Sequence, residues 1–376
     1  MIVLSMFYKH NEGGFNKRLY RMYHALAKHG HEVHYLSCEK FPIENRRVHF
    51  HEIPMPVRNR QGLLFWFLFI IIAPLWAYRV SRVIRPDRIA VFGSWYAVFM
   101  VLPRIFSKCR IVLFLRADSV EVNRIERRPL PARAINYILQ YIGTKISDKI
   151  ICNIELVRAN IIKRFNMPKT KFSILYNNID AVEKADRASL NRVRNELGIK
   201  TGEVAIITSG IFYRRKNIDF LIRAFAKAFT KNNARLVIIG DDVGQGSERR
   251  MLEDLVLSLG KSDCVAFTGW RNDSKRLIGA CDIYVLPTLH EGFPNSLLDA
   301  LGVGCPRLGS RIREVEEILH YDDLLFSLTS HEELAAKLKR FSEDVEYREH
   351  IRQLTIKRAE TCKFDWDRAV VDAVTG

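Results

Sequence analysis

The sequence predicts an α/β protein with two domains, each built around a parallel sheet. A chain of 376 residues is long enough for two domains of roughly 150 residues each. Short apolar runs alternate with stretches of helical periodicity, and this alternation indicates βα units. The composition, with 48% hydrophobic and 27% charged residues, excludes a disordered chain, a collagen-like repeat and a multi-span membrane protein.

In the first half, apolar runs predict strands, and an amphipathic helix lies between the first two. Leu19, Met22, Tyr23 and Leu26 recur at the i, i+3, i+4, i+7 spacing of one buried helix face, and Gly30 follows as a C-terminal signal. The expected strands are residues 2–7, 32–37, 89–92, 111–115 and 149–152.

The second half repeats this pattern after a polar stretch, residues 177–203, which we interpret as a linker with one surface helix. Two Rossmann-like domains separated by a cleft is the simplest architecture, and ligands are then expected at the carboxyl ends of the strands. The expected strands of this half are residues 204–208, 236–240, 265–268 and 283–287.

The cysteines and the start of the chain indicate a cytoplasmic protein. The seven cysteines are scattered and form no C-x-x-C pair, which argues against a disulfide framework or a zinc site and favours a reducing compartment. The chain begins with seven apolar or small residues, too few for the core of a signal peptide. We interpret this segment as the first buried strand.

The charge balance of 59 − 42 = +17 favours an acidic partner, which could be nucleic acid, an anionic membrane surface or a phosphate-bearing substrate. Residues 62–78 hold no charged side chain, but a spanning helix needs roughly 20 apolar residues and Pro74 would kink it. A buried core helix and an interfacial helix on an anionic membrane surface are equally compatible with this run, and the interfacial helix is our working hypothesis. The flanking arginines are Arg58, Arg60, Arg79, Arg82 and Arg85.

Two segments at the expected carboxyl ends of strands could bind phosphate. Gly13 and Gly14 lie between the first strand and the first helix, where the backbone can approach an anion or simply make a tight turn. Arg214, Arg215 and Lys216 follow the first strand of the second half. They can hold phosphate oxygens, although three solvated surface cations are the alternative.

A third segment, HEGFPNSLLDALGVGCP at residues 290–306, follows the strand 283–287 and carries two carboxylates, Glu291 and Asp299. If a helix begins near Asn295, Asp299 lies within its first two turns. Loop NH groups and the helix dipole stabilise negative charge, and carboxylates accept hydrogen bonds from sugar hydroxyls. The segment therefore favours a sugar-phosphate site over a helix cap with an incidental acid.

These segments resemble the retaining glycosyltransferases of family 4, which have the GT-B fold. EGFPNSLLDALGVGCP is similar to the E-x7-E segment of that family, GGFNKRLYRMYHALAKHGHEVHYLS to its opening βα unit, and FDWDRAV to its closing helix. The resemblance implies an acceptor-binding domain over residues 1–180 and a nucleotide-sugar-binding domain over 181–355. It also implies a C-terminal helix over 356–376 that crosses back towards the first domain.

The resemblance also implies roles for individual residues. Arg215 and Lys216 would hold the donor diphosphate, Glu291 would bind the transferred sugar, Asp299 would take the ribose hydroxyls, and Asp118 would complete the catalytic group. The acceptor would meet Gly13, Arg116 and Asp118. The implied donor site comprises Gly14, Arg215, Lys216, Trp270, Arg271, Glu291, Gly292, Phe293, Pro294, Asn295, Ser296, Leu297 and Asp299.

The sequence departs from the family pattern at several positions. Asp299 stands where the family usually has Glu, and Ile211 where many members have Arg. Arg116 and Asp118 stand where many members carry a His near the acceptor, so that either could serve the acceptor or be structural. Residues 311–314 (RIRE) replace the usual glycine-rich turn, and no role is predicted for them.

We therefore expect a metal-independent hexosyltransferase without a cofactor. It would use a UDP- or GDP-linked sugar and a saccharide or lipid-linked acceptor in cell-surface polysaccharide or lipopolysaccharide synthesis. An anionic membrane surface, bound through 62–78 and the flanking arginines, is an expected partner, which places the protein at the inner face of the plasma membrane. The alternatives are a GT-B-type nucleotide-sugar epimerase and a basic nucleic-acid-binding protein. The arginines are spread along the chain without a recognised motif, so no nucleic acid is expected.

Overall fold

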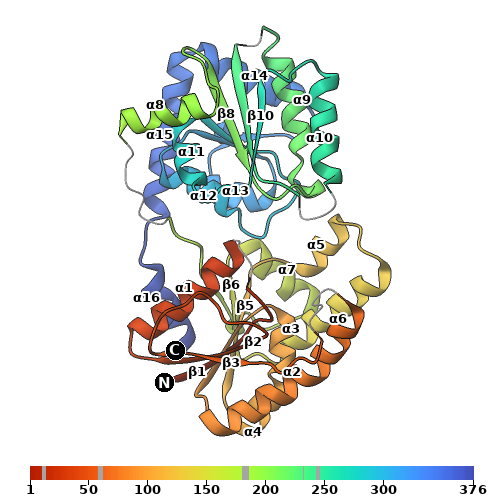
Figure 1. The fold of residues 1–376 in the computed structure, drawn as a ribbon. Coiled ribbons are helices and arrows are strands. Elements are labelled where there is room, and N and C mark those ends of the chain that lie inside the picture. Colours follow the sequence, from red (N-terminus) through yellow and green to blue (C-terminus); the bar gives the residue numbers. More distant parts are fainter. Residues whose placement is uncertain (11–13, 58–61, 180–185, 232, 243–245) are drawn as a thin grey trace. The chain divides into compact units, whose positions relative to one another are not determined.

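The computed structural model describes residues 1–10, 14–57, 62–179, 186–231, 233–242 and 246–376. The chain forms two compact units (Figure 1). Unit 1 comprises Met1–Tyr176 and Asp365–Gly376, and unit 2 comprises Asn177–Phe364. Over the described residues each unit holds one parallel sheet, with seven strands in unit 1 and six in unit 2. This confirms the predicted α/β class with two Rossmann-like domains.

In unit 1 the strand order is β3-β2-β1-β4-β5-β6-β7, and every neighbouring pair is parallel. All five strands expected from the apolar runs are present. Two edge strands, β3 and β7, were not predicted, because β3 reads as the largely polar VHFHE and β7 has only three residues. The strands are β1 Ile2–Met6, β2 Glu32–Ser37, β3 Val48–Glu52, β4 Arg88–Phe92, β5 Arg110–Leu115, β6 Lys149–Cys152 and β7 Phe172–Ile174.

Helices cover both faces of this sheet. Crossovers between parallel strands are right-handed. Helix α1 connects β1 to β2 on one side of the sheet, whereas α2, α6 and α7 connect strands in the opposite direction along the sheet. Helix α1 therefore lies on the opposite face of the sheet from these three helices. The helices are α1 Gly14–Lys28, α2 Leu63–Ile84, α3 Ser94–Phe99, α4 Val101–Ser107, α5 Ser119–Ile125, α6 Leu130–Ile146 and α7 Glu155–Phe165, with the 3-10 turn η1 at Lys169–Lys171.

The core of unit 1 confirms the predicted apolar stripe of the first helix. Leu19, Met22, Tyr23 and Leu26 are fully buried, and they belong to one cluster with residues of β1, β2, β4 and β5. Burying one such side chain stabilises the fold by about 1.5–3 kcal/mol. Gly30 adopts φ +87° directly after α1, a conformation that favours glycine.

The last helix, α16 (Trp366–Thr375), returns from the end of the chain and packs on α1 (Figure 1). Trp366 is buried, and the guanidinium groups of Arg18 and Arg21 lie 5.2 and 5.3 Å from the centre of its ring. Arg21 Nε also lies 2.5 Å from the Asp367 carboxylate. The C-terminal segment is therefore a part of the core of unit 1.

In unit 2 the strand order is β10-β9-β8-β11-β12-β13, again parallel throughout. The four expected strands are present. The pair β12 and β13 was not predicted, because RLGS and LF are too short to stand out as apolar runs. The strands are β8 Val204–Ser209, β9 Ala234–Ile239, β10 Val265–Gly269, β11 Ile283–Leu286, β12 Arg307–Ser310 and β13 Leu325–Phe326.

The surface helix expected within residues 177–203 is α8 Arg187–Glu196, which the Asp186 side chain caps. The other helices are α9 Ile218–Ala228, α10 Ser247–Ser258, α11 Ser274–Ala280, α12 Asn295–Gly302, α13 Arg313–Leu319, α14 His331–Glu343 and α15 Val345–Thr361, with 3-10 turns η2 at Arg214–Lys216 and η3 at Asp322–Leu324.

Three glycines bring the backbone together at the carboxyl ends of β8, β9 and β10. The Gly210 amide donates to Ile239 O at 3.0 Å, and the Gly240 amide donates to Gly269 O at 2.9 Å. A Cβ at Gly240 would lie 2.0 Å from Gly210 O, and Gly240 has φ +122°. Only glycine therefore fits at position 240, and the loops that leave this edge start from a closely packed base.

Candidate active site

The basic turn η2 and the loop after β11 meet at the carboxyl edge of the unit 2 sheet. Strands β8 and β11 are neighbours, so the segments that follow them leave from adjacent positions. The Leu289 amide and the Thr288 hydroxyl both donate to Arg215 O, at 2.7 and 2.9 Å. These bonds fix the turn and the loop to each other.

The turn and the loop hold two cations against one carboxylate. Lys216 Nζ lies 2.5 Å from Glu291 Oε1, and Arg215 Nη1 lies 3.7 Å from Glu291 Oε2. The three side chains are between 7% and 21% exposed, so their charges act in a partly desolvated place where electrostatic interactions are stronger. The structure thus brings together three residues expected at a donor site, and the cluster can hold a phosphate beside a carboxylate.

Tyr284 of β11 lies near this cluster and was not among the site residues predicted from the sequence. Its ring is buried, and its hydroxyl lies 3.3 Å from Ser209 Oγ. Burial, together with the nearby carboxylates of Glu291 and Asp299, raises the pKa of Tyr284 to about 12. The hydroxyl therefore stays protonated at neutral pH. The sequence feature that could have identified Tyr284 is its position in the strand that leads into the loop with Glu291.

Helix α12 begins at Asn295, which confirms the predicted start. Asn295 Oδ1 accepts a hydrogen bond of 2.6 Å from Asn177 Nδ2, and Asp299 lies one turn later with Lys275 Nζ 3.4 Å from its carboxylate. The residues whose backbone is expected to contact the transferred sugar, Gly292 to Asn295, form the loop that leads from Glu291 to the first residue of α12. Leu297 is fully buried in the core, so its side chain is not available to a ligand.

Trp270 and Arg271, expected near the base, follow β10. Trp270 is 58% exposed. Arg271 bonds to Asp273 and to Glu196 of α8, each at 2.7 Å, and these hydrogen bonds raise its pKa. Arg271 is therefore held within unit 2 by two carboxylates, and the neighbouring indole is the group that offers a free surface.

In unit 1, Asp118 is part of a buried ion pair. Its carboxylate is 1% exposed and accepts two hydrogen bonds of 2.7 Å from Arg164, one on each oxygen. Its Oδ1 also accepts from the Val120 amide at 3.2 Å and caps α5. These contacts give Asp118 a structural role in linking β5, α5 and α7.

Of the other two residues expected at the acceptor site, Gly13 lies outside the described residues and Arg116 lies at the end of β5. Gly14, expected at the donor site, is the first residue of α1. Arg116 follows β5, and burial together with the neighbouring Arg18 guanidinium lowers the pKa of Arg116 to about 9. Two arginines near each other concentrate positive charge at this end of the sheet.

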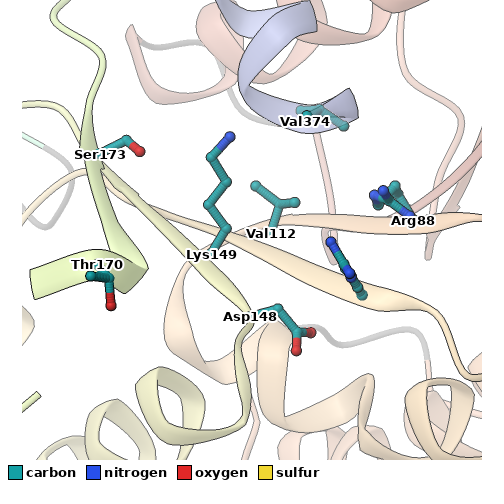
Figure 2. Close-up of a pocket in the computed structure, with 9 residues that line it drawn as sticks. Arg88, Val112, Asp148, Lys149, Thr170, Ser173 and Val374 are labelled. Carbon is teal, nitrogen blue, oxygen red and sulfur yellow. The ribbon is translucent and has the colours of Figure 1, made fainter. Parts of the chain in front are cut away.

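A pocket of about 400 Å³ lies at the opposite edge of the unit 1 sheet, at the amino ends of β4, β5 and β6 (Figure 2). Arg88, Arg110 and Lys149 line it, with Val374 of α16. Asp148 at its rim bonds to Arg104 and to the Ile111 amide, each at 2.8 Å. Ligands of parallel α/β sheets bind at the carboxyl ends of strands, so this pocket is not the candidate site.

Neither a disulfide nor a metal cluster is found in the described parts of the chain. All seven cysteines are buried and free. Over the described residues, three or more His, Cys, Asp and Glu side chains do not gather closely enough to hold a metal ion.

Comparisons with known proteins agree with this architecture. The family model of the glycosyl transferases group 1 matches residues 191–358, and that of glycosyltransferase family 4 matches residues 12–183. A Campylobacter jejuni relative is the N-acetylgalactosamine-N,N'-diacetylbacillosaminyl-diphospho-undecaprenol 4-alpha-N-acetylgalactosaminyltransferase. It is 25% identical over 91% of this chain and 85% of its own.

Two solved structures have the same fold over nearly the whole chain. WaaG, a glycosyltransferase involved in lipopolysaccharide biosynthesis, aligns with a TM-score of 0.78 at 19% identity and covers 100% of both chains. Anabaena HepE in complex with UDP and glucose aligns with a TM-score of 0.80 at 16% identity over 99% of this chain and 97% of its own. The two family models together match most of the chain, one in each half. The chain belongs to glycosyltransferase family 4, has the GT-B fold and is a glycosyltransferase.

Proposed function

We propose that this glycosyltransferase moves a sugar from a nucleoside-diphosphate sugar to a saccharide or lipid-linked acceptor, with retention at the anomeric carbon, in the synthesis of a cell-surface polysaccharide or lipopolysaccharide. The contact that carries the proposal is Lys216 Nζ 2.5 Å from Glu291 Oε1, with Arg215 beside it. The UDP and glucose bound to HepE and the diphospho-undecaprenol acceptor in the name of the Campylobacter relative support the two substrate classes.

The chemistry assigns the cations to the leaving group. The C1–O bond to the diphosphate breaks with its electron pair on the phosphate oxygen, and a C1–O bond to the acceptor forms on the same face of the sugar. The acceptor proton passes to the leaving phosphate oxygen. Arg215 and Lys216 stabilise the charge that develops on that oxygen, an effect worth several kcal/mol in comparable sites. Glu291 accepts hydrogen bonds from sugar hydroxyls.

Thermal denaturation with UDP-, GDP-, ADP- and dTDP-sugars in the presence of EDTA tests the donor site. A ligand that binds only the native state raises the stability by about 2.7 kcal/mol at a hundredfold excess over Kd. We expect a clear shift with a UDP- or GDP-sugar and release of the diphosphate once an acceptor is added. A protein that binds a nucleotide sugar only with added Mg²⁺ or Mn²⁺ would contradict metal independence, and inversion at C1 by NMR would contradict retention.

We also propose that the enzyme works as a peripheral protein at the inner face of the plasma membrane, bound through α2. This helix has 22 residues and is the one in the described chain long and apolar enough to cross a membrane. It packs on unit 1 through one narrow stripe, Phe65, Phe69, Ala73 and Ala77, which are spaced by four. It is thus a one-sided surface helix rather than the fully buried helix that was the alternative.

The side of α2 away from that stripe is an exposed apolar ridge, which α4 extends. Leu63, Phe67 and Leu75 are 91%, 63% and 56% exposed. The rings of Tyr78 on α2 and Phe106 on α4 lie 4.8 Å apart, and Phe106 is itself exposed. The ridge comprises Leu63, Leu64, Phe67, Ile70, Ile71, Leu75, Ile105 and Phe106.

The charges beside the ridge fit an anionic lipid surface. Arg79 and Arg82 lie on the last turns of α2, Arg85 directly follows the helix, and all three are exposed. A helix that spans a bilayer has lipid or other spanning segments on all sides, whereas the buried stripe of α2 is held by unit 1. The helix therefore lies on the surface, with apolar side chains among the acyl chains and arginines at the headgroups.

Flotation with phosphatidylglycerol vesicles, compared with phosphatidylcholine vesicles, tests this surface. Phe67→Glu with Leu75→Glu should weaken binding at least tenfold, and salt should weaken the binding of the wild type. Met251→Glu with Leu257→Glu is the matched control, because both residues are exposed on α10 and the charge change is the same. Equal effects of the two double variants, or a protein that only detergent releases from membranes, would contradict attachment through the ridge.

A further inference from the structure

We infer that Glu314 is a positioning residue of the donor site, which acts through His290. The kinetic test of this inference rests on the proposed function, whereas the hydrogen-exchange test does not. His290 Nδ1 and Glu314 Oε1 are in direct contact, and the two residues are 5% and 6% exposed. Glu314 is the second residue of α13, and His290 directly precedes Glu291. A buried contact thus joins the loop that carries the site carboxylate to the following βα unit.

The contact completes a chain of bonds from η2 to α13. The Thr288 hydroxyl donates to Arg215 O and also contacts His290 O at 3.1 Å. The Ser310 hydroxyl donates to Thr288 O at 2.6 Å. Two contacts therefore hold the main chain at Glu291. One is the ion pair between the Glu291 carboxylate and Lys216, and the other is the contact between the neighbouring His290 side chain and Glu314.

The orientation of the His290 ring depends on this single contact. Among the described residues His290 Nε2 has no hydrogen-bond partner, although the atom is fully buried. With the Glu314 carboxylate as acceptor, Nδ1 carries the proton that it donates to this contact. Removal of the carboxylate leaves both ring nitrogens unsatisfied in the interior, and the loop must then rearrange to solvate them.

This arrangement gives a role to a segment for which the sequence predicted none. Residues 311–314 stand in the place of a glycine-rich turn, and Glu314 is the member of that segment that reaches the loop. Arg311 instead pairs with Asp322 at 2.6 Å on the surface. The contacts of the described residues thus assign the positioning role within RIRE to Glu314.

Steady-state kinetics with the donor sugar identified by the binding screen tests the inference. Glu314→Ala should lower kcat/KM for the donor at least tenfold, and Glu314→Gln, whose amide oxygen still accepts from Nδ1, should recover most of it. Glu316→Ala is the control, because it removes the same charge from the same helix, and among the described residues the Glu316 side chain has no bond to the loop. Kinetics of Glu314→Ala equal to those of Glu316→Ala would overturn the inference.

Hydrogen exchange supplies a readout that needs no substrate and is therefore independent of the proposed function. In Glu314→Ala the amides of residues 288–293, 295 and 296 should exchange faster, whereas Glu314→Gln and Glu316→Ala should match the wild type. If the wild type binds no nucleotide sugar, the proposed function fails while this test still decides the positioning role. Unchanged exchange in Glu314→Ala would refute it.

A paired substitution guards against loss of folding. His290→Phe with Glu314→Leu replaces both polar partners by apolar groups. Because no unpaired charge is then left in the interior, a protein can tolerate such a double replacement. This double variant should melt as a folded protein with the reduced kcat/KM of Glu314→Ala. A folded double variant with the kcat/KM of the wild type would show that the pair stabilises the core and does not position the site.

Discussion

The ammonium of Lys216 lies 2.5 Å from Glu291 Oε1, and each residue comes from a segment that follows a different strand of the unit 2 sheet. The pair is mostly buried, with Lys216 14% and Glu291 7% exposed, and Arg215 lies beside it. A phosphate bound in this cluster would contact Arg215 and Lys216, which also contact the Glu291 carboxylate. The two loops therefore hold two cations and one carboxylate in a single cluster.

Lys216→Ala should abolish transfer and leave the fold intact, because the charge that would stabilise the leaving diphosphate is lost. We expect at least a hundredfold decrease in kcat, about 2.7 kcal/mol at 1.36 kcal/mol per decade. Lys227→Ala is the matched control: Lys227 also contacts a glutamate, Glu332, but on the exposed surface. Activity of Lys216→Ala within a factor of two of that control would remove Lys216 from the site.

Gly240→Ala should destabilise unit 2 strongly. The added Cβ would lie 2.0 Å from Gly210 O, a backbone atom that cannot move away cheaply, and φ is +122°. We expect a loss of about 3 kcal/mol or more in the free energy of unfolding, measured in urea. Gly260→Ala has φ +63° but meets no atom within 4 Å, so it should cost only about 1 kcal/mol.

Asp118→Ala should show whether Asp118 stabilises the fold of unit 1 or binds the acceptor. Removing one partner of the buried pair with Arg164 should cost about 3–5 kcal/mol of stability. Asp372→Ala, which breaks an exposed pair with Arg368, should cost at most about 1 kcal/mol. If Asp118→Ala unfolds at the urea concentration of the wild type but loses activity, Asp118 serves the acceptor rather than the fold.

The sequence predicted the elements that are marked by local patterns. The stripe from Leu19 to Leu26 and the start of α12 at Asn295 depend on neighbours within one or two turns, and both are confirmed. Edge strands such as β3, which is largely polar, and β13, which has only two residues, present no long apolar run, because one side of an edge strand remains unpaired and short strands suffice there.

The contacts that the sequence did not predict join residues far apart in the chain. Asp118 and Arg164 are 46 positions apart, and their pairing depends on the parallel neighbours β5 and β6. The contact between His290 and Glu314 likewise depends on how β11 and β12 lie side by side. Residue type and spacing identify the candidate groups at a sheet edge, whereas the partner of each group follows from strand order.

Alkaline pH should unfold this protein in part through Tyr284. The pKa of Tyr284 is raised to about 12 in the folded state, chiefly by burial, against an ordinary value of 10.0. Between these two values the unfolded chain gives up the phenolic proton while the folded chain keeps it, so the unfolded state binds fewer protons and stability falls as pH rises. The contribution is fully present below pH 10 and is lost as pH rises towards 12.

Urea unfolding at pH 9 and at pH 11 measures this loss. Tyr284→Phe removes the ionisable hydroxyl, and with it the bond to Ser209, so the variant should be less stable than the wild type at pH 9. The free energy of unfolding of the variant should then fall less steeply between the two pH values. The difference from the wild type should be about 1.4 kcal/mol for each pH unit over which Tyr284 is ionised only in the unfolded chain. Ionisation of other tyrosines and lysines affects both proteins equally, so only the difference between the two slopes reports on Tyr284. Equal slopes would show that the Tyr284 hydroxyl titrates normally and is open to solvent beside the Glu291 loop.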